Sequence, residues 1–399
     1  MRSRVSLRKR RVPSRGDITD RCSVFNFKNS SMEKAPITPG ACRPGKYLSR
    51  LKGKRVAFVG NQTSSVNGRH TLDFLLENGV EVVRIFGPEH GFREMADDAT
   101  PVKDRMDTVT GLPVVSLFGD IEKPTPEHLK DIEVFVYDIQ DVGVRFYTYI
   151  STLSFIMEAA GEAGIPVMVL DRPNPNGHYV DGNILDPAFS SFVGRHCVPI
   201  VYGMTVGEYA RMMNREGWLG GGVQCELEVV PVEHYDHSMP YSLPIKPSPN
   251  MPDDKAINLY PSTCFFEGTA LNEGRGTDRP FKVFGSPLLP ETGFSYIPMP
   301  TPGASEPRFK GQVCHGMNLS DYPERLSRVN FEWIIWAYDR YPDKRRFFIP
   351  FFNNLAGGTT IKSQIVAGWS AGQIRDSWRE GILRFKEIRS RYLLYPDFE

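Results

Sequence analysis

The motifs of nucleotide, metal and redox sites are missing from this 399-residue chain. The turn after its first apolar run lacks G-x-G-x-x-G, and no G-x-x-x-x-G-K-[ST] loop occurs, which excludes the usual dinucleotide and phosphate sites. No H-E-x-x-H metal motif is present, and the G-x-S-x-G match Gly368-Trp369-Ser370-Ala371-Gly372 does not follow a predicted strand, as a nucleophile turn requires. The six cysteines are scattered without a C-x-x-C pair, which disfavours a zinc or redox site. We therefore expect no cofactor and no bound metal.

The chain also lacks a strong charge of either sign and any long apolar run. Its net charge of +1 gives no reason to expect a nucleic-acid or anionic-membrane partner. No apolar run reaches the roughly 18 residues of a membrane span. With 40% hydrophobic and 24% charged residues, the composition is that of an ordinary globular protein, and its length favours two domains.

Residues 1–45 differ in composition from the rest. Arginine and lysine crowd the start of the segment, together with Ser, Pro and few large apolar residues. We expect a disordered basic arm here. The arm lacks the apolar core of a secretory signal peptide, and an alternative is that translation begins at Met32.

From Leu51 to about residue 195, apolar runs alternate with segments of helical periodicity. Strands separated by helices imply a parallel, doubly wound sheet, and near-continuous apolar strands agree because such a sheet is covered on both faces. We therefore predict a Rossmann-like α/β domain over residues 46–195. The predicted strands span 55–60, 81–86, 113–118, 133–139 and 166–170, and the predicted helices span 70–78, 124–130 and 151–163.

The alternation changes after about residue 190. A helix is predicted at 205–214 and a strand at 227–232, while 240–310 is rich in Pro and Gly. Two helices are predicted at 329–340 and 371–390. We predict a second, smaller α+β domain over residues 196–399 whose loops close the cleft of the first domain.

Polar side chains follow the predicted strands of the first domain, where parallel strands end at one edge of a sheet. Carboxylates, amides, guanidiniums and phenols together suit a polyhydroxylated ligand such as a sugar. The candidates at these strand ends are Asn61, Gln62, Glu89, His90, Arg93, Asp138, Gln140, Asp141, Arg145, Tyr147, Tyr149, Asp171, Arg172, Asn174 and Asn176. Three loops of the second domain add Asn250, Glu267, Glu273 and Arg275.

Each candidate also has a purely structural interpretation. Asp138 can cap the next helix, and asparagines beside prolines, such as Asn174, can form turns. The alternating Tyr147 and Tyr149 can be one face of a strand, and the second-domain loops can serve domain packing. The Glu89 turn, flanked by Gly-Pro and Gly-Phe at a strand exit, fits a plain surface turn least well.

Nine segments of the chain, taken in order, match one known family. They are VAFVGNQTS (56–64), IFGPEHGFR (85–93), TGLPVVSLFG (110–119), YDIQDVGVRFYTYISTL (137–153), LDRPNPNG (170–177), YGMTVGEYA (202–210), KPSPNMP (246–252), FFEGTALNEGRGTDRPF (265–281) and RYLLYP (391–396). Through these segments the chain resembles the NamZ-type exo-β-N-acetylmuramidases.

The resemblance implies a Rossmann-like N-terminal domain, a smaller C-terminal domain and an active-site cleft between them. It implies release of N-acetylmuramic acid from the non-reducing ends of peptidoglycan fragments, with Glu89 as the catalytic glutamate. A periplasmic or extracellular location is implied too, although the basic arm stands where relatives carry a secretion signal, so the cytoplasm is the alternative. Segment 94–98 also replaces the glycine-rich turn expected after Arg93.

Glycoside hydrolysis needs a proton donor for the leaving oxygen and a stabiliser for the oxocarbenium-like centre. Glu89 is the predicted acid, with burial beneath Phe86 and Phe92 favouring its protonated form, and His90 is expected to orient it or bind substrate. Asp138 completes the predicted catalytic set. The sequence leaves the second carboxylate open among Asp138, Asp141, Asp171, Glu267 and Glu273, and the substrate's own acetamido group is a further option.

The lactyl carboxylate of muramic acid requires a cation, and Arg145, Arg172 and Arg275 are the candidates. The alternative function is a non-catalytic peptidoglycan-binding protein with a degenerate site. An amidase or esterase acting on cell-wall peptides is disfavoured, because it would need an activated nucleophile or a metal motif.

Overall fold

The computed structural model describes residues 35–93, 97, 100 and 103–399. Most of the predicted basic arm, and most of segment 94–98, lie outside these residues. The end of the arm belongs to the fold: the Thr38 amide donates to Glu233 O (2.9 Å) and the Gly40 amide donates to Asp171 O (2.8 Å). The chain therefore joins the folded structure before residue 45.

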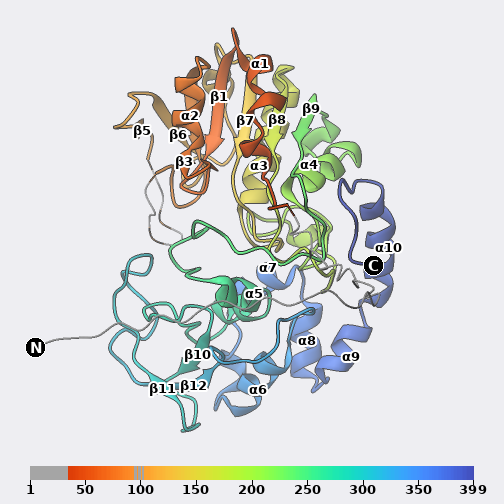
Figure 1. Ribbon diagram of the computed structural model, residues 1–399. Helices are drawn as coiled ribbons and strands as arrows, with labels where there is room; N and C mark the ends of the chain where they lie inside the picture. The colour runs from red at the N-terminus through yellow and green to blue at the C-terminus, as the bar shows by residue number, and fades with distance from the viewer. Residues whose placement is uncertain (1–34, 94–96, 98–99, 101–102) are drawn as a thin grey trace, which may run out of the picture. The chain divides into compact units, whose positions relative to one another are not determined.

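Seven strands form one sheet in the order β5-β6-β4-β1-β7-β8-β9 (Figure 1). All neighbouring pairs are parallel except β5 with β6. The strands span Arg55–Gly60 (β1), Glu81–Gly87 (β4), Arg105–Met106 (β5), Pro113–Ser116 (β6), Val134–Asp138 (β7), Val167–Leu170 (β8) and Leu227–Val230 (β9). The strand order reverses direction between β1 and β7, which is where doubly wound sheets form a ligand crevice.

Alternate residues of the strands face opposite sides of the sheet, as the two-residue period of a strand requires. In β1, Val56 and Phe58 pack in a core with the helices α1 (Leu48–Leu51) and α2 (Thr71–Glu77). Ala57 and Val59 belong to a core on the other face. That second core includes α3 (Tyr149–Ala163) and α4 (Val206–Arg215).

The C-terminal half contains a three-stranded antiparallel sheet and six α-helices. Phe265 and Phe352 of this half lie in the same hydrophobic core as Tyr147 of the first half, so one core joins the two. The elements are α5 (Asp254–Thr263), β10 (Val283–Ser286), β11 (Ser295–Tyr296), β12 (Cys314–Asn318), α6 (Glu332–Arg340), α7 (Phe351–Ala356), α8 (Thr360–Val366), α9 (Ala371–Asp376) and α10 (Arg379–Ser390).

The predicted fold class is confirmed, and all five predicted strands of the first domain are present. Two elements differ from expectation. The helix predicted at 371–390 is two helices, α9 and α10, separated by Ser377 and Trp378, and the Trp378 ring is buried against Phe331. The strand predicted at 227–232 is β9, the edge strand of the large sheet. The exact domain boundaries stay a prediction.

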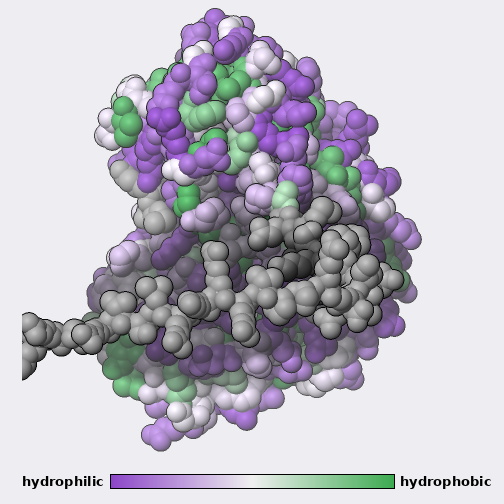
Figure 2. Space-filling view, viewed as in Figure 1, coloured by the Kyte–Doolittle hydropathy of each residue, from purple (hydrophilic) through white to green (hydrophobic). Residues whose placement is uncertain are grey.

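The surface of the described chain is largely hydrophilic on the face shown in Figure 2, with hydrophobic residues in small groups. Within the described residues, no helix has the length and apolarity to cross a membrane.

Candidate active site

The connection after β4 holds the predicted acid in a strained turn. β4 ends at Gly87, and His90 and Gly91 then adopt positive φ angles of 70° and 91°. A left-handed conformation at a residue with a side chain is uncommon, and such strain clusters at functional sites. The turn holds Glu89 largely buried, with 9% of its surface exposed.

Glu89 and His90 line a cavity of about 330 Å³. The cavity lies between the connections that follow β4 and β7 and the loops and helices of the C-terminal half. Its volume is near the lower end of the range for small-molecule sites, about 300–1,000 Å³. The lining residues are Glu89, His90, Phe118, Glu122, Phe146, Tyr147, Thr148, Tyr149, Phe192, Val193, Ser248, Asn250, Met251, Tyr260, Cys264, Glu267, Arg275, Phe281, Phe351 and Leu355.

The connection from β7 to α3 supplies the phenols and a hydroxyl. The Thr148 hydroxyl donates to Glu89 Oε2 (2.7 Å). The rings of Tyr147 and Tyr149 meet edge to face, with centroids 4.8 Å apart. The Tyr149 hydroxyl donates to Pro247 O (3.0 Å), whereas the buried Tyr147 hydroxyl has no hydrogen-bond partner among the described residues. Burial raises the pKa of both tyrosines, so both hydroxyls keep their protons at neutral pH.

The C-terminal half supplies an ion-pair cluster. Arg275 Nη1 lies 3.0 Å from Glu267 Oε1 and 2.8 Å from Glu273 Oε1, and its guanidinium stands over the Phe281 ring at 4.9 Å from the centroid. Asn250 is held by donating to Gly303 O (2.8 Å). Glu267 and Arg275 of this cluster line the same cavity as Glu89.

Seven of the predicted site residues line this cavity: Glu89, His90, Tyr147, Tyr149, Asn250, Glu267 and Arg275. Glu273 lines an adjacent cavity together with Glu267 and Arg275. The structure thus brings these eight together, and their chemical roles stay predictions.

Asp138, predicted as catalytic, does not line the cavity. It is fully buried in a two-point ion pair with Arg172, with Nε to Oδ1 at 2.6 Å and Nη2 to Oδ2 at 2.9 Å. The Thr71 hydroxyl also donates to its Oδ2 (2.6 Å). These contacts join the end of β7, the segment after β8 and the start of α2. Neither residue is placed to serve as the second carboxylate or the lactyl-binding cation.

Arg145 also lies away from the cavity lining. Its guanidinium is fully buried and donates to the carbonyl oxygens of Asn183 (2.7 Å), Val198 (3.0 Å) and Leu355 (3.1 Å). Burial lowers its pKa to about 9, because the loss of hydration disfavours the charged guanidinium. Arg145 therefore links the two halves through backbone carbonyl oxygens, and it is not placed for the expected contact with a substrate carboxylate.

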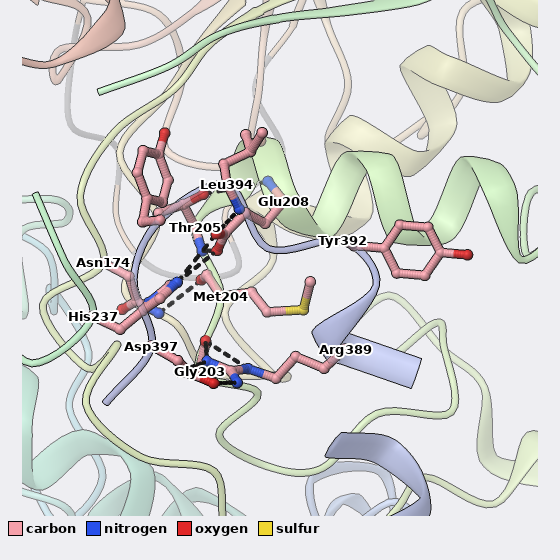
Figure 3. Close-up of polar contacts among 12 residues, drawn as sticks. Asn174, Gly203, Met204, Thr205, Glu208, His237, Arg389, Tyr392, Leu394 and Asp397 are labelled. Carbon is pink, nitrogen blue, oxygen red and sulfur yellow. Dashed lines mark hydrogen bonds and ion pairs between the residues drawn. The ribbon is translucent and has the colours of Figure 1, made fainter. Parts of the chain in front are cut away.

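The residues after β8 have structural partners as well. Asp171 accepts hydrogen bonds from the Thr205 hydroxyl (2.7 Å), the Gly207 amide (2.8 Å) and the Tyr395 hydroxyl. Burial raises the pKa of Asp171 to about 6. The Asn174 side chain donates to Met204 O (2.8 Å), as Figure 3 shows.

Asn176 links the halves by donating to Val142 O (3.0 Å) and Ile257 O (3.1 Å). The C-terminal tail packs beside Asn174: the Leu394 amide donates to Glu208 Oε1 (2.7 Å), and Arg389 binds both Gly203 O and Asp397 (Figure 3). The RYLLYP segment therefore anchors the end of the chain.

Five further candidates are held in turns or ion pairs. Asn61 Oδ1 accepts from the Thr63 amide (2.9 Å), and Gln62 Nε2 donates to Pro247 O (3.0 Å). The Gln140 side chain donates to Asp141 O and Pro173 O. The Asp141 carboxylate accepts from the Gly143 amide and the Tyr202 hydroxyl. Arg93 forms ion pairs with Asp73 and Asp107. None of the five lines the cavity of Glu89.

Sequence reasoning missed several lining residues. Thr148 could have been found, since it lies between the two predicted tyrosines. Phe351 lies far from any singled-out motif and reaches the cavity only through the fold. Glu122 follows the 110–119 segment by three residues, but a lone glutamate in a polar loop has no distinguishing pattern. Phe86, which was expected to bury Glu89, instead packs against Phe135 in the core.

Comparisons with known proteins place the chain in a family. Two family models match consecutive parts: exo-beta-N-acetylmuramidase NamZ, N-terminal, over residues 56–255, and its C-terminal counterpart over 258–395. The peptidoglycan beta-N-acetylmuramidase NamZ of Bacillus subtilis strain 168 is 37% identical over 405 residues, covering 95% of this chain and 96% of that protein.

Two crystal structures of DUF1343-family proteins from Bacteroides fragilis share the fold. One is 42% identical with a TM-score of 0.84, covering 91% of this chain and 100% of that one. The other is 30% identical with a TM-score of 0.76, covering 90% and 99%. These matches confirm the resemblance. The chain belongs to the NamZ family of exo-beta-N-acetylmuramidases.

Proposed function

We propose that this protein hydrolyses the glycosidic bond of a terminal N-acetylmuramic acid in peptidoglycan fragments and releases that sugar from the non-reducing end. The family makes the chain an enzyme of the glycoside hydrolase class. One observation carries the proposal: a buried carboxylate, Glu89, stands in a strained turn on an aromatic-lined cavity. The cavity's volume of about 330 Å³ is within the range of small-molecule sites and suits a sugar.

Glu89 supplies the proton to the leaving oxygen in this mechanism. The hydrogen bond from Thr148 fixes the orientation of its carboxyl group. His90 lines the same cavity and is placed to contact substrate. Proton donation by a positioned carboxylic acid contributes about 10²–10⁴ to the rate.

The positive charge that develops on the sugar needs a stabiliser on the opposite side. Two further carboxylates line the cavity, Glu267 and Glu122. The substrate's 2-acetamido group is the third group that can act at this step, as in substrate-assisted glycosidases. Asp138 has no part in it, because its carboxylate is enclosed by Arg172 and Thr71.

Arg275 is the proposed partner of the lactyl carboxylate. Of the three arginines considered from the sequence, it is the one that lines the cavity. A guanidinium has five N–H donors, so it can contact a substrate carboxylate while it keeps Glu267 and Glu273. Those two glutamates fix the plane of the guanidinium and so make the contact geometrically selective.

The test is turnover of a chromogenic β-N-acetylmuramide against the matched β-N-acetylglucosaminide, which lacks only the lactyl ether. The proposal expects release of chromophore from the muramide and a preference of about ten- to a hundred-fold, as charge-assisted contacts of roughly 1.5–3 kcal/mol produce. No turnover of either sugar would overturn the activity. Equal turnover of both would overturn the recognition of the lactyl group.

We also propose a periplasmic or extracellular location, where peptidoglycan fragments arise. Fractionation of the native cells followed by immunodetection tests it, and recovery in the cytoplasmic fraction alone would contradict it.

A further inference from the structure

The outer edge of the large sheet carries backbone groups that pair with nothing in the described chain. β9 is the last strand of this sheet and lies beside α4 at its border (Figure 1). The carbonyl groups of Glu226 and Val230 accept hydrogen bonds from the β8 side, at 2.8 Å and 3.0 Å. Because the backbone groups of a strand alternate between its two edges, Leu227 and Val229 direct theirs away from β8. Within the described residues, these outward amides and carbonyls have no hydrogen-bond partner.

The same edge is paired on either side of these two residues. Before them, the Asn214 side chain of α4 donates to Cys225 O (3.0 Å) and accepts from the Cys225 amide (3.0 Å), which are the two bonds that an added strand would make. After them, Thr38 and Glu233 exchange both backbone hydrogen bonds as an antiparallel bridge, at 2.9 and 2.8 Å. The outward groups between these positions form the open edge of β9. An unpaired strand edge is a template for an added extended segment.

A groove of about 540 Å³ runs beside the open edge. α4 forms one of its walls through Arg211 and Arg215, and no acidic residue of the described chain lines it. Neither arginine forms an ion pair within that part of the chain, since Glu216, the neighbour of Arg215, pairs with Arg391 at 3.0 Å. The groove therefore presents uncompensated positive charge next to unpaired backbone groups, and this combination favours an acidic, extended ligand.

The two arginines of the groove are spaced as the side chains of an added strand would be. α4 connects β8 to β9, so it runs alongside the strands. Arg211 and Arg215 lie four residues apart on one face of this helix, with a rise of about 6 Å between them. Alternate side chains of an extended strand lie on one face and are about 6.6 Å apart. Two acidic residues separated by one residue can therefore face both guanidiniums while the backbone pairs with β9.

We infer that the open edge of β9 and its arginine groove bind an extended segment of a partner protein with two acidic side chains at alternate positions. Backbone hydrogen bonds to Leu227 and Val229 hold the segment, and the arginines select its charge. The site is separate from the cavity of Glu89, because no residue lines both.

Charge also argues against two other occupants of the groove. Pairing of two β9 edges from two copies of this chain would bring both pairs of arginines, Arg211 and Arg215, together at one junction, where like charges repel. The start of this chain is itself basic, so the same arginines disfavour it.

The experiment uses two capped heptapeptides of identical composition as probes. In acetyl-Gly-Val-Glu-Val-Glu-Val-Gly-amide the two glutamates share one face of an extended chain. In acetyl-Gly-Val-Val-Glu-Glu-Val-Gly-amide they point to opposite faces. Isothermal titration calorimetry with the full chain should show at least about tenfold tighter binding of the first peptide, because the second can make only one of the two charge-assisted contacts. The first peptide should also slow hydrogen exchange in segment 226–230, where it covers the unpaired amides.

Two variants and a control locate the binding. Arg215→Glu reverses the charge of an exposed position and should weaken the first peptide at least about tenfold. Leu227→Pro removes an amide that does not bond to β8, which a strand edge tolerates, and should weaken the same peptide. Arg345→Glu, at a side chain that is 91% exposed in the C-terminal half, is the control and should change the affinity less than about twofold. Hydrolysis of the chromogenic muramide should be unchanged in the three variants.

The outcomes are distinct from those that test the hydrolase activity. Equal affinities for the two peptides, no binding of either, or wild-type affinity in Arg215→Glu would overturn the inference. A concentration-dependent dimer in light scattering that Leu227→Pro abolishes would assign the open edge to a second copy and would overturn it too. Should Leu227→Pro fail to fold, Arg215→Glu and the exchange of segment 226–230 decide the question.

Discussion

The Thr148 hydroxyl donates a 2.7 Å hydrogen bond to Glu89 Oε2, although the two residues follow different strands of the sheet. Glu89 follows β4 and Thr148 follows β7, and β1 lies between these two strands. The bond therefore joins two connections at the edge of the sheet next to the switch point. It identifies Thr148 as a positioning residue for the proposed acid.

Thr148→Val should reduce kcat about tenfold without unfolding the protein, because leaving a buried carboxyl oxygen without its donor costs about 1–3 kcal/mol. Thr148→Ser keeps the hydroxyl and should restore most of the activity. Steady-state kinetics with thermal denaturation of both variants checks this. Equal activity of the Val and Ser variants would show that the hydroxyl does not position Glu89.

Asp138→Asn should destabilise the fold strongly while the folded fraction keeps its catalytic rate. Removing one partner of a buried ion pair leaves Arg172 uncompensated and typically costs about 3–5 kcal/mol of unfolding free energy. Glu380→Gln, in an exposed pair with Arg384, is the matched control and should change stability little. Urea denaturation gives the free energies, and a stable but inactive Asp138→Asn variant would return Asp138 to the catalytic set.

Arg275→Lys should weaken the preference for the muramide over the glucosaminide, because lysine cannot reproduce a planar two-point contact. Arg145→Lys should lower stability and leave the preference unchanged, since Arg145 contacts backbone carbonyls of both halves. The ratio of kcat/KM on the two chromogenic sugars measures the preference. The opposite pattern would assign the lactyl carboxylate to Arg145.

The buried His196 should lower the unfolding free energy of the protein in acid. Burial, and then the charge of Arg195, lower the pKa of this imidazole to about 3, and its nitrogens contact Ser154 Oγ (3.2 Å) and Tyr209 Oη (3.1 Å). The unfolded chain takes up the proton near pH 6.5, so the unfolding free energy falls as pH drops from 6.5 towards 3, by about 1.4 kcal/mol per pH unit.

Urea denaturation between pH 7.5 and pH 5 of the wild type and of His196→Gln isolates this contribution. The variant should lose that part of the pH dependence, whereas His234→Asn, at an exposed position, should keep it. A wild-type slope that persists in His196→Gln would assign the acid sensitivity to other groups.

The fold of the first half was predictable because its strands are near-continuous apolar runs, such as 55–60, between segments of helical period. The Glu89 turn was predictable for the same reason, since a strand exit with Gly-Pro and Gly-Phe is a local pattern. The roles of Asp138, Arg172 and Arg145 were not, because a buried ion pair and a set of carbonyl contacts depend on residues distant in the sequence.

The C-terminal half was harder to predict for a related reason. Residues 240–310 hold few periodic runs, and their loops are positioned by contacts such as Asn250 with Gly303. Phe351 reaches the cavity only through that packing. The fold class could be predicted from the hydrophobic periodicity and from the order of strands and helices along the chain. Which residues form the site depends on distances between residues far apart in the sequence, and no local pattern encodes them.

The most direct test of the account is the rate of Glu89→Gln on two muramides with different leaving groups, the disaccharide and a dinitrophenyl muramide. Glutamine keeps the size of the side chain but cannot give up a proton. The disaccharide, which needs an acid for its leaving oxygen, should lose at least about 10² in kcat, and the activated dinitrophenyl sugar should lose much less. Glu127→Gln, a surface change in the 3₁₀ helix at Pro126–Leu129, is the control and should be fully active. A Glu89→Gln variant that keeps more than half of the wild-type rate on the disaccharide would contradict the assignment of Glu89 as the acid.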